Sequence, residues 1–295
     1  MRNAKKPILS REEIIGLLMI TPALAVLALV YFYPLGYNID LSFSNWPIKE
    51  ALPKYYVGLD NYMRLFSDRD FQTVIVNTLF FTALSVPTEL FIGLGIALLL
   101  NREIKGKTVF ITLLALPMIV APVVAALAWK WLYFYDYGAL NYVLSFVGIH
   151  PIRWMSDVNY AIYSIIIADV WTTTPFMMLI LYAGLQMIPT QLYEAARMDG
   201  ASQWHIFWRI TLPSLKSVLA VALMIRTIDA FTKLFDIVYV ITGGGPGYAT
   251  EVLPTFGYKE AFTFFELGRS AAITMITLLI SAVMVVIILR SSRRK

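Results

Sequence analysis

Four ionisable residues follow one another at helical spacing inside an apolar stretch: Arg226, Asp229, Lys233 and Asp236. Their intervals of 3, 4 and 3 residues predict that all four side chains lie along one face of a helix. A charged residue that faces lipid at mid-membrane costs roughly 2.5–3.5 kcal/mol. The face therefore predicts either a polar solute passage or a ladder of internal ion pairs, since neighbours alternate in sign. Phe231 is a candidate stacking surface beside it.

Three further charges interrupt apolar stretches singly: Glu89, Lys130 and Asp169. We expect each of them to pair within a helical bundle, because an unpaired charge in lipid is costly. Two aspartates, Asp169 and Asp229, could share a proton in an intramembrane enzyme. No Gly-x-Gly-Asp, Gly-x-Ser-x-Gly or His-Glu-x-x-His pattern accompanies them, so an enzyme is less favoured than either of the two transporter hypotheses given below.

Metal and nucleotide sites are not expected on this chain. Its two histidines, His150 and His205, have no metal-ligand spacing, and it has no cysteine. The tripeptide Gly106-Lys107-Thr108 resembles the end of a phosphate-binding loop, but position 101 holds asparagine where that pattern needs glycine. No bound cofactor and no nucleic-acid partner are therefore predicted.

The composition of the chain predicts that these residues lie on membrane helices. Of the 295 residues, 59% are apolar and 15% are charged, against about 25% charged in a typical soluble chain. A helix needs about 20 apolar residues to cross a bilayer. The sequence predicts an all-α, polytopic membrane protein with six spans at residues 14–33, 71–100, 108–129, 159–187, 218–242 and 270–289.

Lysine and arginine are unevenly distributed between the segments that join these spans. With the N-terminus inside, the inner segments hold fourteen basic residues, and the outer loops 34–70, 133–158 and 243–267 hold six. Basic residues concentrate on the cytoplasmic side. The bias predicts that both termini and the segment between the fourth and fifth spans are cytoplasmic.

That inner segment, residues 189–213, has its own pattern. Pro189 suits the first turn of a helix that runs to Met198, and Gly200 suits the left-handed position that ends it. Ser202 is the expected N-cap of a second short helix, which Pro213 should end. From these residues alone, a docking element and a plain amphipathic connector are equally good interpretations.

The same segment resembles the "EAA" loop of the permeases of binding-protein-dependent ABC importers. The resemblance rests on Glu194-Ala195-Ala196, Asp199-Gly200 and Ile210-x-Leu212-Pro213, and extends over roughly residues 17–289. Phe235-Asp236 and the following Gly243, Gly244, Gly245 and Pro246 are similar to the sugar-transport branch, of maltose and glycerol-phosphate type. That branch carries polar amides where this chain has Phe231 and Leu234.

The resemblance implies a type I importer permease that forms half of a carbohydrate pathway in a bacterial or archaeal plasma membrane. Its domains would be a cytoplasmic N-terminus (1–13), one permease domain (14–290) and a basic cytoplasmic tail (291–295). Expected partners are membrane lipid, a second homologous permease, two ATPase subunits that use ATP and Mg²⁺, and an extracytoplasmic solute-binding protein. The chain itself would not be an enzyme.

Roles for individual residues follow from the same resemblance. The ATPase would contact Glu194, Ala195, Ala196, Asp199 and Gly200, while the solute-binding protein would face the glycine turn at 243–246, expected to be flexible. The fourth span would add Trp171, Thr173 and Phe176 to the solute pathway. The competing hypothesis is a secondary transporter, in which the charged face carries ions; such folds show internal repeats, and we find none.

Overall fold

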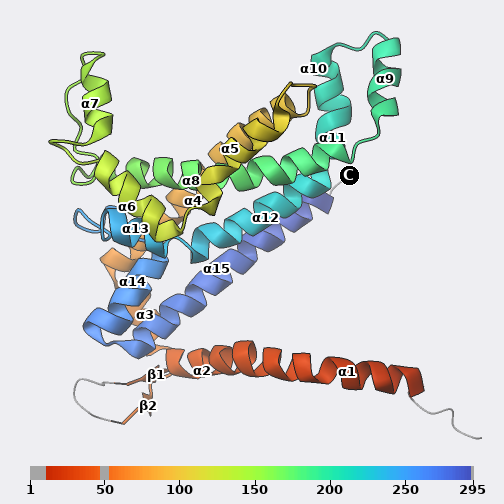
Figure 1. Cartoon of the computed structure of the whole chain (residues 1–295). Helices are drawn as coiled ribbons and strands as arrows, with labels where there is room; N and C mark the ends of the chain where they lie inside the picture. The colour runs from red at the N-terminus through yellow and green to blue at the C-terminus, as the bar shows by residue number, and fades with distance from the viewer. Residues whose placement is uncertain (1–10, 47–52, 294–295) are drawn as a thin grey trace, which may run out of the picture.

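A computed structural model describes residues 11–46 and 53–293. Residues 1–10 and 294–295, which belong to the predicted N-terminus and tail, lie outside this range. Long helices run between two ends of the molecule (Figure 1). One, which we term the α9 end, carries α9 (Thr190–Met198) and the C-terminus. The opposite end, the loop end, carries α7 (Ala139–Ser145) and α14 (Leu253–Lys259).

The first membrane helix is longer than expected. It comprises α1 (Arg11–Leu27), the π-helical turn η1 (Ala28–Phe32) and α2 (Tyr33–Ser42), and so continues nine residues beyond the predicted end at residue 33. Pro34 does not stop it, because the π-helical turn η1, in which Tyr33 N donates to Ala28 O, comes directly before it, and such local adjustments let membrane helices accommodate proline. In its most apolar window none of the residues is buried, and only α2 packs beside the long last helix, α15 (Leu267–Arg293).

The centre of the fold is the pair α4 (Arg69–Leu100) and α8 (Ala161–Gln186), which pack along most of their lengths. Gly93 allows this approach, since a Cβ there would lie 2.8 Å from the Met177 Cβ, closer than side chains tolerate. Both helices continue through an internal proline, as membrane helices commonly do. The predicted second, fourth and sixth spans are thus single helices.

The third predicted span, 108–129, is broken, which corrects the expectation of one helix. Its two pieces, α5 (Lys107–Ile119) and α6 (Pro122–Leu132), meet at 92°. Val120 and Ala121 are extended between them, with ψ of 132° and 134°. Pro122 disfavours helical geometry in the residue before it, and its fixed φ suits the start of a new helix.

The fifth predicted span, 218–242, is also two helices. α12 (Lys216–Thr232) has Lys233 as its non-helical C-cap, and α13 (Phe235–Ile241) begins two residues later. Neither proline nor glycine lies at this break. Instead Leu234, 1% exposed, enters the apolar cluster formed by α4, α6, α8 and α13, so tertiary packing sets the position of the break.

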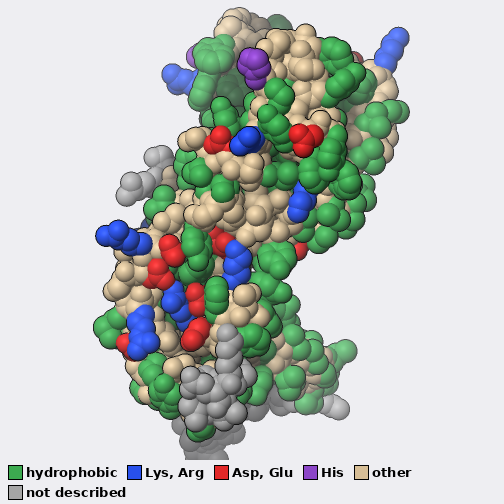
Figure 2. All heavy atoms as spheres, turned by 90° about the vertical axis from the view of Figure 1, so that its left-hand side faces the viewer, with side chains coloured by type: hydrophobic (Ala, Val, Ile, Leu, Met, Phe, Trp, Pro, Cys, Tyr) green, Lys and Arg blue, Asp and Glu red, His purple; other side chains and the backbone are tan. Residues whose placement is uncertain are grey.

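The loop end is built from short elements. Strands β1 (Ser44–Asn45) and β2 (Tyr55–Tyr56) pair antiparallel, and α3 (Asp60–Ser67) precedes α4. Acidic and basic side chains intermingle on this end (Figure 2). Arg269 pairs with Asp68 and, at 3.3 Å, with Glu260. Burial raises the pKa of the Glu260 carboxyl above its ordinary value, and the charge of Arg269 opposes that shift.

Candidate functional site

An ion cluster of Ser85, Glu89, Asp169 and Arg226 joins three helices in the middle of the bundle. Arg226 on α12 donates from Nε to Glu89 Oε2 (2.6 Å) and from Nη2 to Glu89 Oε1 (2.9 Å), and it also donates to Asp169. Ser85 Oγ lies 2.6 Å from Glu89 Oε1 and from Asp169 Oδ2. The cluster thus ties α12 to both α4 and α8.

All three ionisable side chains of this cluster are buried: Glu89 is 0%, Arg226 3% and Asp169 7% exposed. Charged groups at such depth persist only when they are paired and hydrogen-bonded. The expectation that Glu89 and Asp169 pair within the bundle is confirmed. For Arg226 the geometry favours the internal ion-pair alternative, because its guanidinium is enclosed between α4 and α8 and bonded to carboxylates on both.

Only Asp229 shares α12 with Arg226; the other two charges of the predicted face lie beyond the end of that helix. Asp229 pairs with Lys233 through Oδ1 and Nζ at 2.9 Å, and the Lys233 side chain is 73% exposed. Asp236 lies on α13, beyond the break at Lys233. The prediction of one continuous four-residue face is therefore wrong, since the helix that would carry it ends at Thr232. Lys130, from α6, donates to the Val240 carbonyl at 2.8 Å.

The predicted pathway residues on the fourth and fifth spans differ in exposure. Trp171 is 44% exposed and meets the Trp129 ring edge-to-face, with centroids 5.8 Å apart. Thr173 donates to its own helix at the Asp169 carbonyl (2.7 Å), and Phe176 packs against an internal apolar cluster. Phe231 is 0% exposed and packs among α4, α14 and α15, so its ring is part of the core and does not face an open surface.

The segment between α8 and α12 folds as its residues predict. α9 ends in a Schellman motif, in which Ala201 N donates to Ala196 O (2.9 Å) and Gly200 N donates to Arg197 O (3.0 Å). Gly200 has φ of +76°, the left-handed value that glycine adopts without strain. Ser202 Oγ accepts from His205 N (3.3 Å) and caps α10 (Gln203–Ile206). Pro213 does not end the second helical piece, which runs to Ser214 before a 63° bend.

α9 offers an open face to a partner. Glu194, Ala195 and Asp199 are exposed, and Ala196 is half-buried. Within the described part of the chain, no side-chain hydrogen bond or ion pair is made by Glu194 or Asp199. The segment is tethered to the bundle on its other side, where Tyr193 Oη lies 3.3 Å from Thr211 Oγ1. A short rigid helix is thus held at the α9 end with one face uncovered.

The glycine turn at 243–246 is held by hydrogen bonds, contrary to the expectation of a flexible loop. Thr250 Oγ1 donates to Gly245 O (2.7 Å), Thr250 N donates to Gly244 O (3.2 Å), and Lys259 Nζ donates to Gly243 O (2.7 Å). Gly243 and Gly244 have φ of +64° and +89°. Glycine is therefore needed at these two positions for backbone geometry. The side chains of Thr250, which precedes α14, and of Lys259, at the end of α14, hold the turn in place.

Sequence reasoning missed some members of these sites. Ser85 belongs to the ion cluster but is an ordinary polar residue within an apolar span. Glu251 and Lys259, which pair beside the glycine turn, fell in a loop without any recognisable motif. The signal that predicted a partner for Glu89 also applies to Glu251: an acidic residue in an apolar surrounding needs a cation nearby.

Comparisons with known proteins agree with this geometry. A family profile described as "Binding-protein-dependent transport system inner membrane component" matches residues 75–295. The trehalose/maltose transport system permease protein MalF of Thermococcus litoralis is 41% identical over 96% of this chain and 95% of its own length. The sulfoquinovosyl glycerol transport system permease protein SmoG of Agrobacterium fabrum is 36% identical over 96% and 92%.

The fold is similar to a solved structure. A chain of a bacterial ABC transporter involved in the import of the acidic polysaccharide alginate superposes with a TM-score of 0.83 and 22% identity, and 96% of each chain is covered. A bacterial alginate ABC transporter has also been solved in complex with an alginate pentasaccharide-bound periplasmic protein, and there the TM-score is 0.82. This likeness shows a type I importer permease fold.

Proposed function

This chain belongs to the family of inner-membrane components of binding-protein-dependent transport systems, and on that premise we propose that it is the permease subunit through which an ATP-driven importer takes up a carbohydrate. The observation that carries the proposal is the exposed α9 helix, held between the fourth and fifth spans with its Glu194 face uncovered. A trehalose/maltose permease is among its relatives, which supports a disaccharide of this kind as substrate.

α9 is the contact for a cytoplasmic ATPase. Glu194, Ala195, Ala196, Asp199 and Gly200 would enter a cleft on that subunit, and the small alanine side chains let its backbone come close. ATP-driven closure of two such subunits would move α9 as a rigid body, together with the helices to which it is joined. ATP and Mg²⁺ therefore act on the partner, and the movement reaches the bundle through this segment.

The remaining partners follow from surfaces that the bundle does not cover. The first helix, Ile15–Ser42, is apolar, and its most apolar window is unburied in the isolated chain, which suits contact with lipid and with a second, homologous permease. The turn at 243–246 would face an extracytoplasmic solute-binding protein. The α9 end, with the C-terminus and the first residues of α1, would be cytoplasmic in a bacterial or archaeal membrane, as the excess of basic residues there supports.

Half of the solute pathway would be formed by polar and aromatic residues that the bundle leaves at least partly accessible. We assign this role to Asp229, Lys233, Asp236, Trp171, Thr173 and Phe176. Arg226 and Phe231 take structural roles instead, because both are enclosed by protein. The Asp229–Lys233 pair is the centre of this surface.

Replacing Asp229 by leucine is expected to lower trehalose or maltose uptake at least fivefold with little change in the amount of folded protein. The pair is partly exposed, with side-chain exposures of 73% for Lys233 and 32% for Asp229, so its contribution to stability is small. Its loss leaves Lys233 uncompensated in the pathway. Uptake into cells, normalised to membrane protein level, measures the effect, and Asp136→Leu, at an exposed acid of the loop end, is the control. Normal uptake in the Asp229 variant would remove this pair from the pathway.

The test of the proposed function is copurification with an ATPase. The tagged chain, purified in mild detergent from its own membranes, is expected to carry an ATPase subunit, and Glu194→Lys is expected to lower its recovery at least tenfold. Glu103→Lys is the matched control, because Glu103 is also an exposed acid and lies in the loop that joins α4 to α5. Equal recovery in both variants would contradict the docking role of α9.

Uptake by the same system separates the competing transporter classes. ATP-dependent accumulation of a disaccharide, which requires an added solute-binding protein, is the expected result. Accumulation driven by an ion gradient without ATP would favour the secondary transporter instead.

A further inference from the structure

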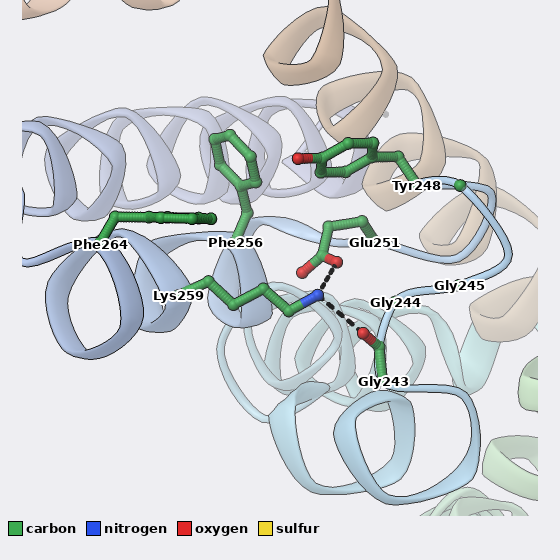
Figure 3. A pocket seen from close by; sticks show the side chains of 9 residues that line it. Gly243, Gly244, Gly245, Tyr248, Glu251, Phe256, Lys259 and Phe264 are labelled. Carbon is green, nitrogen blue, oxygen red and sulfur yellow. Dashed lines mark hydrogen bonds and ion pairs between the residues drawn. The ribbon is translucent and has the colours of Figure 1, made fainter.

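A cavity of about 240 Å³ lies beside the glycine turn at the loop end (Figure 3). Its walls come from the turn, from α14 and from the π-helical turn η4 (Glu260–Phe264). Cavities that hold drug-sized ligands are about 300–1,000 Å³, so this one suits a single small ring. The residues that line it are Gly243, Gly244, Gly245, Gly247, Tyr248, Glu251, Phe256, Lys259 and Phe264.

Glu251 presents an unused acceptor to this cavity. Its side chain is 1% exposed, and its Oε2 accepts from Lys259 Nζ. Its Oε1 is buried and has no hydrogen-bond partner among the described residues. Figure 3 shows the Glu251 carboxylate turned toward Lys259, with Phe256 beside it and Phe264 farther away. A buried acceptor without a donor is unfavourable, so a donor from a ligand would be stabilised here.

The other groups in the cavity complement that acceptor. Lys259 Nζ donates to Glu251 and to Gly243 O, and an ammonium has a third proton to donate. Phe256 is 3% exposed and forms part of the wall, whereas Phe264 is 47% exposed at the mouth. The cavity thus combines one acceptor, one donor and an accessible aromatic face.

Charge and shape select the ligand class. A cation would be repelled by Lys259 and an anion by Glu251, since the two lie in direct contact. A neutral ring with several hydroxyl groups satisfies all three features. One hydroxyl donates to Glu251 Oε1, another accepts from Lys259, and the C–H face of the ring packs on the electron-rich face of Phe264.

We propose that this cavity is an outer subsite that binds one pyranose unit of the transported carbohydrate before it reaches the membrane pathway. The proposal rests on the proposed function, because it takes the solute to be a carbohydrate. It adds a binding role for Glu251, Lys259 and Phe264 on the side from which solute arrives.

Thiol protection tests the subsite at a defined position, because the chain has no cysteine of its own. Gly245→Cys places a thiol in the cavity wall, where a Cβ would have its nearest neighbours at 3.6 and 3.9 Å and so fits without displacement. In the assembled transporter, without solute-binding protein, saturating trehalose or maltose is expected to slow maleimide labelling at least threefold. Sorbitol at the same concentration, which has no ring, is expected to protect less.

Two further substitutions in the Gly245→Cys background identify the groups responsible. Phe264→Ala is expected to abolish protection, and Phe262→Ala to retain it, since Phe262 is 66% exposed but does not line the cavity. Glu251→Gln is expected to weaken protection, because the amide supplies one oxygen in place of two.

Each contrary outcome has a distinct meaning. Equal protection in the Phe264 and Phe262 variants, or protection that appears only when solute-binding protein is added, would overturn the subsite. If the Gly245→Cys transporter takes up either sugar at the wild-type rate but neither sugar slows maleimide labelling, the subsite is overturned and the proposed function stands. Absence of both uptake and protection for the two sugars would overturn the two together.

Discussion

Arg226→Leu is expected to lower the stability of the folded chain by about 3–5 kcal/mol, the usual result of removing one partner from a buried ion pair. Two carboxylates, 0% and 7% exposed, would lose the guanidinium that compensates them. α12 would also lose its hydrogen bonds to α4 and α8. Melting of a fluorescent fusion in detergent, followed by size-exclusion chromatography, measures the change.

Companion variants distinguish charge compensation from simple packing. Arg226→Lys keeps the charge but loses the two-pronged hydrogen bonding to Glu89, so it is expected to fall between wild type and leucine. Adding Glu89→Gln and Asp169→Asn to Arg226→Leu should restore most of the stability, because no charge is then left buried. Arg102→Leu, at an exposed arginine, is the control. A triple variant no more stable than Arg226→Leu alone would show that charge compensation is not the reason for the loss.

Gly200→Val is expected to reduce ATP-dependent uptake at least tenfold while the ATPase remains bound and active. Gly200 has φ of +76°, and a left-handed conformation costs an L-residue about 1–2 kcal/mol, more when the side chain is β-branched. A Cβ at this position meets no atom within 4 Å, so the effect is conformational and not a clash. The turn between α9 and α10 would open and the two helices would no longer move together. Stimulation of ATP hydrolysis by sugar-loaded binding protein is the direct readout.

Gly106 supplies a closely matched control. It has φ of +75°, a Cβ added there would also meet no atom within 4 Å, and it precedes α5 in a different loop. Gly106→Val therefore introduces the same backbone strain away from α9 and is expected to keep the stimulation. Gly200→Asn is expected to be close to wild type, since asparagine adopts the left-handed conformation more readily than valine. Loss of stimulation in the Gly106 variant to the same extent would show that α9 has no special part in coupling.

Local chemistry was enough to predict the α9–α10 segment. The end of α9 at Met198, the left-handed Gly200 and the Ser202 cap each depend on residues within one or two turns. The hydrophobic lengths of the second, fourth and sixth spans were likewise sufficient, because a long apolar run in lipid can satisfy its backbone only as a helix.

The structure of the charged face could not be predicted from local sequence. The spacing of Arg226, Asp229, Lys233 and Asp236 predicts one charged face only if the helix that carries them is continuous. The break after Thr232 depends on Leu234 entering a cluster made by helices far away in the chain. The partners of Arg226 stand 137 and 57 residues before it, so no local pattern could identify them.

Composition and short-range backbone preferences were enough to predict that this chain spans a membrane and where most of its helices lie. They also identified the segment that resembles the ATPase contact of an importer. The packing of the helices determines which charges are buried between α4, α8 and α12 and which remain exposed. It also placed the unpaired oxygen of Glu251 beside aromatic rings at the loop end. Burial and pairing are set by packing between helices, so two cations of one predicted face differ: Arg226 is enclosed by protein, whereas the Lys233 side chain is 73% exposed.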